Sequence, residues 1–192
     1  QDLREDLLPH THASRIKACV ALEPAGDVVH VAVMTSLRSL AERIHALDAE
    51  IKMIGKQHDA LVRQAAPTLL GLRQVGPQVA ARMLITAGQN PDRLRSEPSF
   101  ARLCGVAPIP ASSGKTTRRR LHRGGDRQAN RALYLVATGR MKDHPPTLAY
   151  VQRKTAPDGT IDTKHVIRCL KRYVARELYQ ALKTDLAALD RP

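Results

Sequence analysis

Residues 37–65, LRSLAERIHALDAEIKMIGKQHDALVRQA, indicate the fold class of this chain. Apolar side chains recur there at alternating steps of three and four residues, the repeat of a helix with one apolar seam. Thr35 or Ser36 is suited to cap the start of this helix, and Pro67 ends it. The seam consists of Leu37, Leu40, Ile44, Leu47, Ile51, Ile54, His58, Leu61 and Ala65.

Two structures are compatible with this seam. A coiled coil through residues 37–65 would join identical copies as a homodimer or a tetramer. The alternative is a long amphipathic helix that folds back on its own domain. We expect a coiled coil over residues 35–66, in which His58 is a polar break in the seam rather than a ligand.

The first 34 residues predict no definite structure. Pro9, Pro24 and Gly26 interrupt residues 1–34, and such residues break regular elements. Val28–Met34 is compatible either with a strand or with a helical lead-in.

The pattern around Val75-Gly76-Pro77, within residues 69–84, resembles a helix–hairpin–helix. We expect Gly76 to supply a turn conformation that other residues resist, and Pro77 to begin the second helix. The free N–H groups at such a helix start suit a DNA phosphate, although an ordinary helical hairpin has the same pattern.

Four more helices are expected beyond this turn. The first covers residues 91–105, beginning at Asn90 or Pro91, and the second begins at Asp126. The others are Thr147–Lys154 and Thr163–Leu189. With 3% aromatic residues and a single Phe, their core is expected to be aliphatic. The fold class is therefore mainly α, a long coiled-coil-like helix followed by a compact helical domain over residues 67–192 with a helix–hairpin–helix-like element.

Positive charge is concentrated in the second part of the chain. Residues 1–66 hold eight Lys/Arg and nine Asp/Glu, whereas the remainder holds 23 Lys/Arg and nine Asp/Glu. The net charge of +13 predicts a polyanionic partner, DNA in the first place. An anionic membrane is disfavoured because no apolar run reaches the roughly 18 residues of a spanning helix. We expect a cytoplasmic protein that associates with DNA.

The three cysteines, Cys19, Cys104 and Cys169, are far apart and form no Cys-x-x-Cys pair. They are interpreted as free or buried thiols of a cytosolic protein. Their spacing with histidine argues against a zinc site.

The densest basic stretch is residues 111–131, with seven Lys/Arg against one acid, Asp126. Ser112, Ser113 and a glycine come directly before it. Hydroxyl groups beside cations and a flexible turn fit a serine that attacks a phosphodiester. A loop that only binds phosphate needs the same residues, and the physical pattern does not choose between Ser112 and Ser113.

Candidate nucleic-acid contacts extend over the whole basic part of the chain. The last helix combines an apolar face with a basic face. The basic face could simply be solvated, but the high positive charge of this region favours contacts with nucleic-acid phosphates. The candidates are Gly76, Lys115, Arg118, Arg119, Arg120, Arg123, Arg127, Arg131, Lys164, Arg168, Lys171, Arg172 and Arg176.

Several motifs in one order resemble the C-terminal transposase domain of the insertion sequence 110 family. The resemblance covers about residues 35–182. Its motifs are the hairpin at 72–84, Leu-Cys-Gly-Val-Ala-Pro (103–108), Ser-Ser-Gly-Lys (112–115), Arg-Gly-Gly-Asp-Arg-Gln-Ala-Asn-Arg-Ala-Leu-Tyr (123–134) and Arg-Cys-Leu-Lys-Arg-Tyr-Val-Ala-Arg-Glu (168–177).

The resemblance implies a function and a nucleophile. The family's serine precedes the glycine of the Ser-Gly pair, which selects Ser113 over Ser112 as the residue that attacks DNA and forms a transient phosphoserine. The resemblance also implies a structured non-coding guide RNA as a partner. The serine hydroxyl needs activation, and His122 is the nearest histidine in sequence that could act as its base. The favoured expectation is instead that a metal held by the rest of the protein activates the attack.

The resemblance is incomplete in one respect. The family joins this domain to an RuvC-like domain with four metal-binding acids, and Asp2, Glu5, Asp6, Glu23 and Asp27 do not form such a set. We expect no cofactor on this chain, a divalent metal such as magnesium in the RuvC-like domain, and no recombination by the chain alone. The alternatives are a non-catalytic nucleic-acid-binding module of the helix–hairpin–helix type and an inactive truncated transposase.

Overall fold

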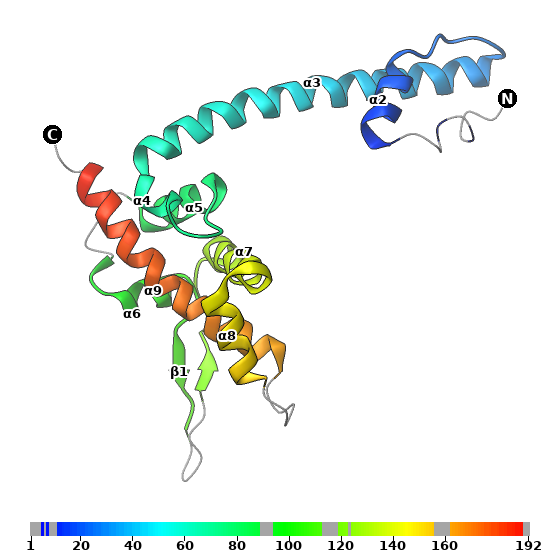
Figure 1. The fold of residues 1–192 in the computed structure, drawn as a ribbon. Helices are drawn as coiled ribbons and strands as arrows, with labels where there is room; N and C mark the ends of the chain where they lie inside the picture. The colour runs from blue at the N-terminus through cyan, green and yellow to red at the C-terminus, as the bar shows by residue number, and fades with distance from the viewer. Residues whose placement is uncertain are drawn as a thin grey trace. The chain divides into compact units, whose positions relative to one another are not determined.

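The structure is a computed structural model, and helices make up most of what it describes, which confirms a mainly α fold (Figure 1). The chain divides into two compact units, residues 1–58 and 59–192. The structure describes Glu5, Leu7 and residues 11–88, 94–112, 119–122, 124–155 and 162–189, without the side chains of Arg119 and Leu121.

In the first unit, α2 (His12–Val20) precedes the long helix α3 (Val28–Ala65), whose residues 28–58 belong to this unit. The helical alternative for residues 28–34 is therefore the one observed. The prediction that Thr35 or Ser36 caps α3 is wrong, because Asp27 Oδ1 accepts a hydrogen bond from His30 N at 2.8 Å. An aspartate here satisfies a free N–H of the first helical turn. Ser36 lies inside the helix and donates to the Ala32 carbonyl.

The predicted seam of α3 is largely exposed in the described chain. Leu40, Ile51 and Leu61 are 59%, 66% and 66% exposed. Large apolar side chains repeated along one helix at this exposure indicate an interaction surface. The coiled coil itself stays a prediction.

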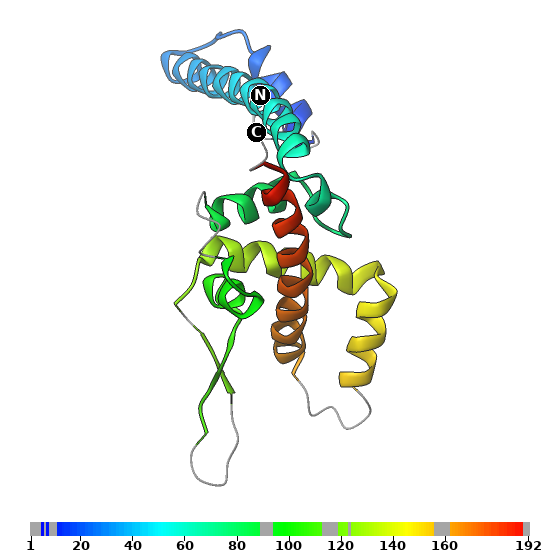
Figure 2. The same cartoon turned by 90° about the vertical axis from the view of Figure 1, so that its left-hand side faces the viewer.

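The second unit is built on two helices, α7 (Arg127–Asp143) and α9 (Thr163–Leu189), which cross in Figure 2. Around them lie α4 (Pro67–Leu70), α5 (Pro77–Ala87), α6 (Glu97–Leu103) and α8 (Pro145–Lys154). The core side chains come from all of these helices except α8, which contributes partly buried ones. The largest of the fully buried apolar side chains are Leu69, Met83, Phe100, Leu133, Val136, Val166, Leu178 and Leu182.

A buried carboxylate fixes the C-terminal part of α9 to the start of α4. Asp185 is 1% exposed and accepts hydrogen bonds from Thr68 N and Leu69 N, each at 2.9 Å. These are free N–H groups of a helix start that has no cap of its own. The contact explains an acidic residue inside the apolar face of α9.

Two predicted details around α5 and α6 are wrong. Helix α6 begins after Ser96, whose Oγ accepts from Ser99 N, and not at Asn90 or Pro91, which lie outside the described residues. Gly76 has an extended backbone, with φ −92° and ψ 175°, while Gln74 has a φ of 63°. The left-handed turn before α5 therefore falls on Gln74 rather than on the glycine.

Other predicted boundaries are confirmed. Pro77 begins α5, and Asp126 caps α7 by accepting from Gln128 N and Ala129 N. Asp162 Oδ1 accepts from Lys164 N at the start of α9, which ends at Leu189. Because α4 is a single turn, the helix–hairpin–helix remains a prediction.

Candidate nucleic-acid interface

A short hairpin carries the serine-containing segment. Strands β1 (Pro108–Pro110) and β2 (Arg119–Leu121) are antiparallel, with Ile109 opposite Arg120. Two prolines are tolerated in β1 because it has a partner on one side only. The connection between the strands begins with Ala111 and Ser112, both exposed. Ser113 belongs to the same connection but lies outside the described residues.

Two glycines hold the base of this hairpin against α7. Gly105 has a φ of +65°, in the region that favours glycine. A Cβ added to Gly125 would lie 2.5 Å from Gly105 N and 2.6 Å from Gly105 Cα. Asp126 N also donates to the Leu103 carbonyl at 2.8 Å. No residue with a side chain fits at position 125 without separating these segments.

Asn130 and Lys171 complete the attachment of this base. Asn130 Nδ2 donates to the carbonyls of Cys104 and Gly105 at 2.9 and 3.0 Å. Lys171 Nζ donates to Asn130 Oδ1 at 2.8 Å, so that α9 orients the amide. Burial and the nearby Arg168 lower the pKa of Lys171 below its usual value. Lys171 thus has an internal role.

The start of α7 is held by a charged cap. Partial burial opposes ionisation of Asp126, but hydrogen bonds from Thr86 Oγ1, at 2.7 Å, and from the N–H groups of Ala129 and Gln128 outweigh it and lower its pKa. Burial, with a contribution from Asp126, raises the pKa of the neighbouring Cys104 to about 12. Cys104 is therefore an inert thiol of the core.

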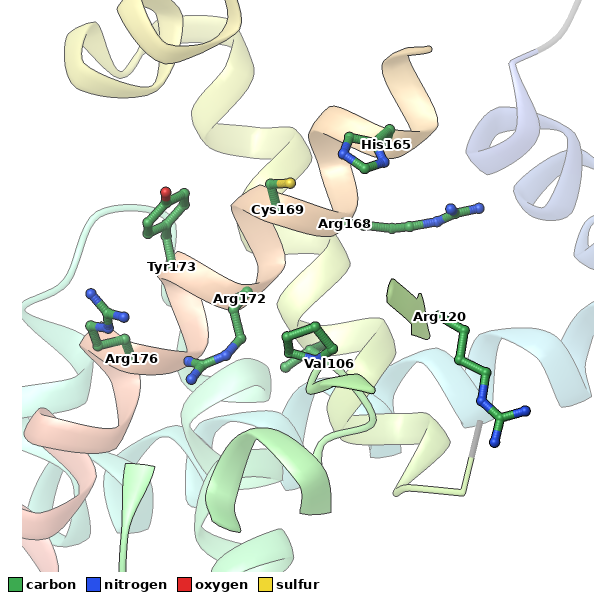
Figure 3. Close-up of a pocket in the computed structure, with 9 residues that line it drawn as sticks. Val106, Arg120, His165, Arg168, Cys169, Arg172, Tyr173 and Arg176 are labelled. Atoms are coloured by element: carbon green, nitrogen blue, oxygen red, sulfur yellow. The ribbon is translucent and has the colours of Figure 1, made fainter. Parts of the chain in front are cut away.

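A cavity of about 430 Å³ lies between the hairpin base and α9 (Figure 3). From the hairpin side it is lined by Val106, Pro108 and Arg120. The side chains from α9 lie along two neighbouring rows of the helix, spaced four residues apart. They are Arg168, Arg172 and Arg176 in one row and His165, Cys169 and Tyr173 in the other.

The arginines of this cavity differ in whether a carboxylate of the chain already binds them. Arg172 forms a two-point ion pair with Glu97 at the start of α6, with its second contact at 2.8 Å. Burial and the neighbouring Arg176 lower the pKa of Arg172. Among the described residues, no carboxylate pairs with Arg168, Arg176 or Arg120. Like charges at this spacing repel on a helix, so a bound anion would stabilise the row.

One ring of an aromatic pair, that of Tyr173, lines the same cavity. The rings of Tyr173 and Tyr150 are 5.3 Å apart at an interplanar angle of 74°. Arg153 lies over the Tyr150 ring, 5.6 Å from its centroid. Burial, assisted by a hydrogen bond with Cys169, raises the pKa of Tyr150 above its usual value. Tyr173 also lines a second cavity between α7, α8 and α9, so it separates two hollows.

The sequence-predicted residues divide into three groups. Ser113, Lys115, Arg118, Arg123 and the side chain of Arg119 lie outside the described residues. Lys171 and Arg172 have the internal partners described above. The described candidates that remain exposed are Ser112, Gly76, Arg120, Arg127, Arg131, Lys164, Arg168 and Arg176.

The sequence analysis missed His165, Cys169 and Tyr173 as members of the site. Their spacing of four residues, in the row beside the arginines, was a signal that could have found them. Val106 and Pro108 could not be found this way, because only the folding of the hairpin base against α9 brings them to the cavity.

His122 lies on the other side of the hairpin base. It borders a cavity of about 610 Å³ together with Arg102 and Gly124. Its Nδ1 is buried and has no hydrogen-bond partner in the described structure. Because Ser113 is not described, the less favoured alternative of the sequence analysis, His122 as its base, is not tested by the structure.

The described residues offer neither a cluster of metal ligands nor a membrane-spanning helix. Among the described residues, no group of three or more His, Cys, Asp or Glu side chains is arranged to hold a metal ion. None of the described helices is both long and apolar enough to cross a membrane.

Comparison with known proteins identifies the family. Residues 66–152 match the family model described as Transposase IS116/IS110/IS902 family. The chain is 30% identical over 153 residues to the insertion element IS110 uncharacterized 43.6 kDa protein of Streptomyces coelicolor, covering 78% of this chain and 35% of that protein. It is 28% identical over 145 residues to the insertion element IS900 uncharacterized 42 kDa protein of Mycobacterium paratuberculosis, covering 72% and 35%.

The aligned part thus spans about a third of the length of each relative, 35% in both cases. The matched segment, residues 66–152, contains the hairpin, the glycine contact and the cap of α7. Through this segment the chain belongs to the IS116/IS110/IS902 family of transposases.

Proposed function

We propose that this chain is the part of an insertion-sequence transposase that cuts and rejoins DNA, with Ser113 as the nucleophile. The observation that carries the proposal is the cavity beside the hairpin base. Its unpaired cations, Arg168, Arg176 and Arg120, lie next to the strands whose connection contains Ser113. Cations held in a partly enclosed site are suited to bind phosphates and to stabilise charge that develops on them.

The chain geometry limits how far the serine lies from the cavity. Ser113 follows Pro108, which lines the cavity, by five residues. A fully extended segment of that length spans at most about 18 Å. A DNA strand bound to the cavity's arginines would therefore pass within reach of the connection.

The chemistry consists of two ester exchanges. Ser113 Oγ attacks a DNA phosphorus, an Oγ–P bond forms, and the P–O bond to one strand segment breaks. The departing DNA oxygen takes up a proton as the serine hydroxyl loses one. A DNA hydroxyl then attacks the phosphoserine, which restores a phosphodiester and returns a proton to Ser113. The phosphodiester is conserved throughout, so rejoining needs no nucleotide hydrolysis.

The family resemblance implies a divalent metal that the RuvC-like domain would hold, rather than this chain. The described residues contain no cluster of metal-binding side chains, and no step above is assigned to a metal. The residues on this chain would instead bind and orient the strands. A protein with this role acts on chromosomal DNA in the bacterial cytoplasm, and the same cations suit a structured guide RNA.

The second candidate function is nucleic-acid binding without chemistry. It is favoured by one observation, that the described cations account for binding even if no serine reacts. The two functions differ in whether a covalent protein–DNA bond forms, and the first prediction separates them.

We expect Ser113→Ala, in the transposase that contains this chain, to abolish strand exchange while DNA affinity changes less than about twofold. The reason is that the substitution removes the attacking oxygen and no cation. The measurement combines a recombination assay with mass spectrometry of the adduct formed on a suicide DNA substrate.

Ser112→Ala is the matched control, because it removes the adjacent hydroxyl. It should retain both the adduct and strand exchange. Recombination that survives Ser113→Ala would show that the nucleophile is assigned wrongly.

We expect the double variant Arg168→Ala/Arg176→Ala to weaken DNA binding and to reduce its salt dependence. Each lost phosphate contact lowers the slope of log K against log salt by about 0.9, so the double variant should lose about 1.8. Fluorescence anisotropy at several salt concentrations measures the slope. Lys52→Ala/Lys56→Ala removes the same charge from α3, and an equal loss there would contradict a specific role for the cavity.

We also propose that the exposed α3 seam joins copies of the chain as a dimer or tetramer. Leu47→Arg/Ile51→Arg should convert the assembly to monomers, because it buries charge in the seam. Met53→Arg is the control, since Met53 is 56% exposed on α3 but outside the seam. Sedimentation velocity measures the mass, and an unchanged mass in the seam variant would exclude this interface.

A further inference from the structure

The cavity between the hairpin base and α9, here named the α9 cavity, has side chains that a phosphate site does not require. Beside its cations it presents Val106, Pro108, Cys169 and the ring of Tyr173. Double-stranded DNA offers a protein its phosphates on the outside and keeps the faces of its bases stacked. A site for duplex phosphates alone would therefore have no use for an apolar wall and an aromatic ring.

Tyr173 is placed as a stacking surface would be. Tyr173 is 52% exposed and lines the cavity. The edge-to-face contact with Tyr150, at 5.3 Å, holds its orientation before any ligand binds. Aromatic rings presented in this way stack on unpaired bases, and every base has a face that can take part.

Two cations line the same cavity as this ring (Figure 3). Arg176 lies three residues after Tyr173, on a neighbouring face of α9, whereas Arg168 lies five residues before it and extends to another side of the helix. Neither is paired with a carboxylate in the described structure. A strand whose base lies on Tyr173 would thus have Arg176 beside the ring and Arg168 farther along the cavity for its next phosphate.

The size of the cavity agrees with a single nucleotide. At about 430 Å³ it falls in the lower half of the range, roughly 300–1,000 Å³, of sites that bind small molecules. Such a volume accommodates one base with its sugar.

We propose that the α9 cavity binds one unpaired nucleotide, with its base on Tyr173 and its phosphates on Arg168 and Arg176. The proposal rests on the proposed function, because it assumes that the cations bind nucleic acid. An unpaired nucleotide can come from a DNA strand opened for exchange or from a guide RNA. Both sources offer the same chemistry, a base face between two phosphates.

The test compares oligonucleotides that differ in one unpaired position. Fluorescence titration of the 192-residue chain uses a DNA duplex with a single bulged 2-aminopurine, the fully paired duplex, and the same bulge in RNA. We expect the bulged duplexes to bind about 5- to 100-fold more tightly than the paired one, the range that stacking of one base supports. The DNA and RNA arms show which source binds better.

Three tyrosine variants assign the effect to the cavity. Tyr173→Ala should remove the preference for the bulge, whereas Tyr173→Phe should retain it because stacking needs the ring alone. Tyr134→Ala is the matched control, since Tyr134 is 45% exposed on α7 and does not line the cavity. It should leave the preference unchanged.

Cys169 provides a readout without substitution, because it lines the cavity and is partly exposed, while Cys19 and Cys104 are buried. Bound bulged DNA should slow alkylation of Cys169 by iodoacetamide more than paired DNA does. Equal binding of bulged and paired DNA by the unmodified chain, or a bulge preference that survives Tyr173→Ala, would overturn the inference and leave the proposed function standing. Absence of binding to every oligonucleotide would overturn both.

Discussion

The contact of Gly125 with Gly105 is the constraint on which the candidate site depends. The two glycines are about twenty residues apart in sequence, yet a Cβ on Gly125 would lie only 2.6 Å from Gly105 Cα. The hydrogen bonds of Asn130 to Cys104 and Gly105 then fix the direction of the chain that leaves this point. As a result the hairpin starts beside α9 rather than in solvent, with Pro108 and Arg120 lining the cavity.

Helix α9 serves the core and the site at the same time. One face buries Val174, Leu178 and Leu182, which supplies the apolar area that stabilises the second unit. The other face carries cations spaced four residues apart, an arrangement that costs free energy through repulsion. Glu97 offsets part of this repulsion at Arg172. Arg168 and Arg176 pair with no carboxylate among the described residues, which agrees with the proposal that an anionic partner binds them.

The sequence was sufficient for several features that depend on neighbours along the chain. Asp126 as a cap and Pro77 at a helix start were predicted, because each acts within one helical turn. The left-handed turn at Gln74 was missed, since an adjacent glycine seemed the better candidate by its chemistry alone. The seam of α3 was predicted as a pattern, but a single chain does not reveal what covers it.

The parts that could not be predicted depend on residues far apart in sequence. Lys171 and Arg172 resemble Arg168 and Arg176 in composition, yet Asn130 and Glu97 bind them from 41 and 75 residues away. Only the folded chain separates internal cations from available ones. The family motifs around residues 103–108 and 123–134 are explained in the same way. Their glycines, Asp126 and Asn130 build the base of the hairpin. Neither motif contains Ser113, the proposed nucleophile.

Hydrogen exchange of the β2 amides in Gly125→Ala tests this account most directly. A methyl group at position 125 would separate the hairpin base from α7, so exchange at residues 119–122 should accelerate about tenfold or more while the amides of α9 keep their protection. Gly124→Ala is the matched control, because a Cβ there would meet only the His122 ring, at 3.5 Å. Unchanged protection of β2 in Gly125→Ala would contradict the claim that this contact positions the hairpin.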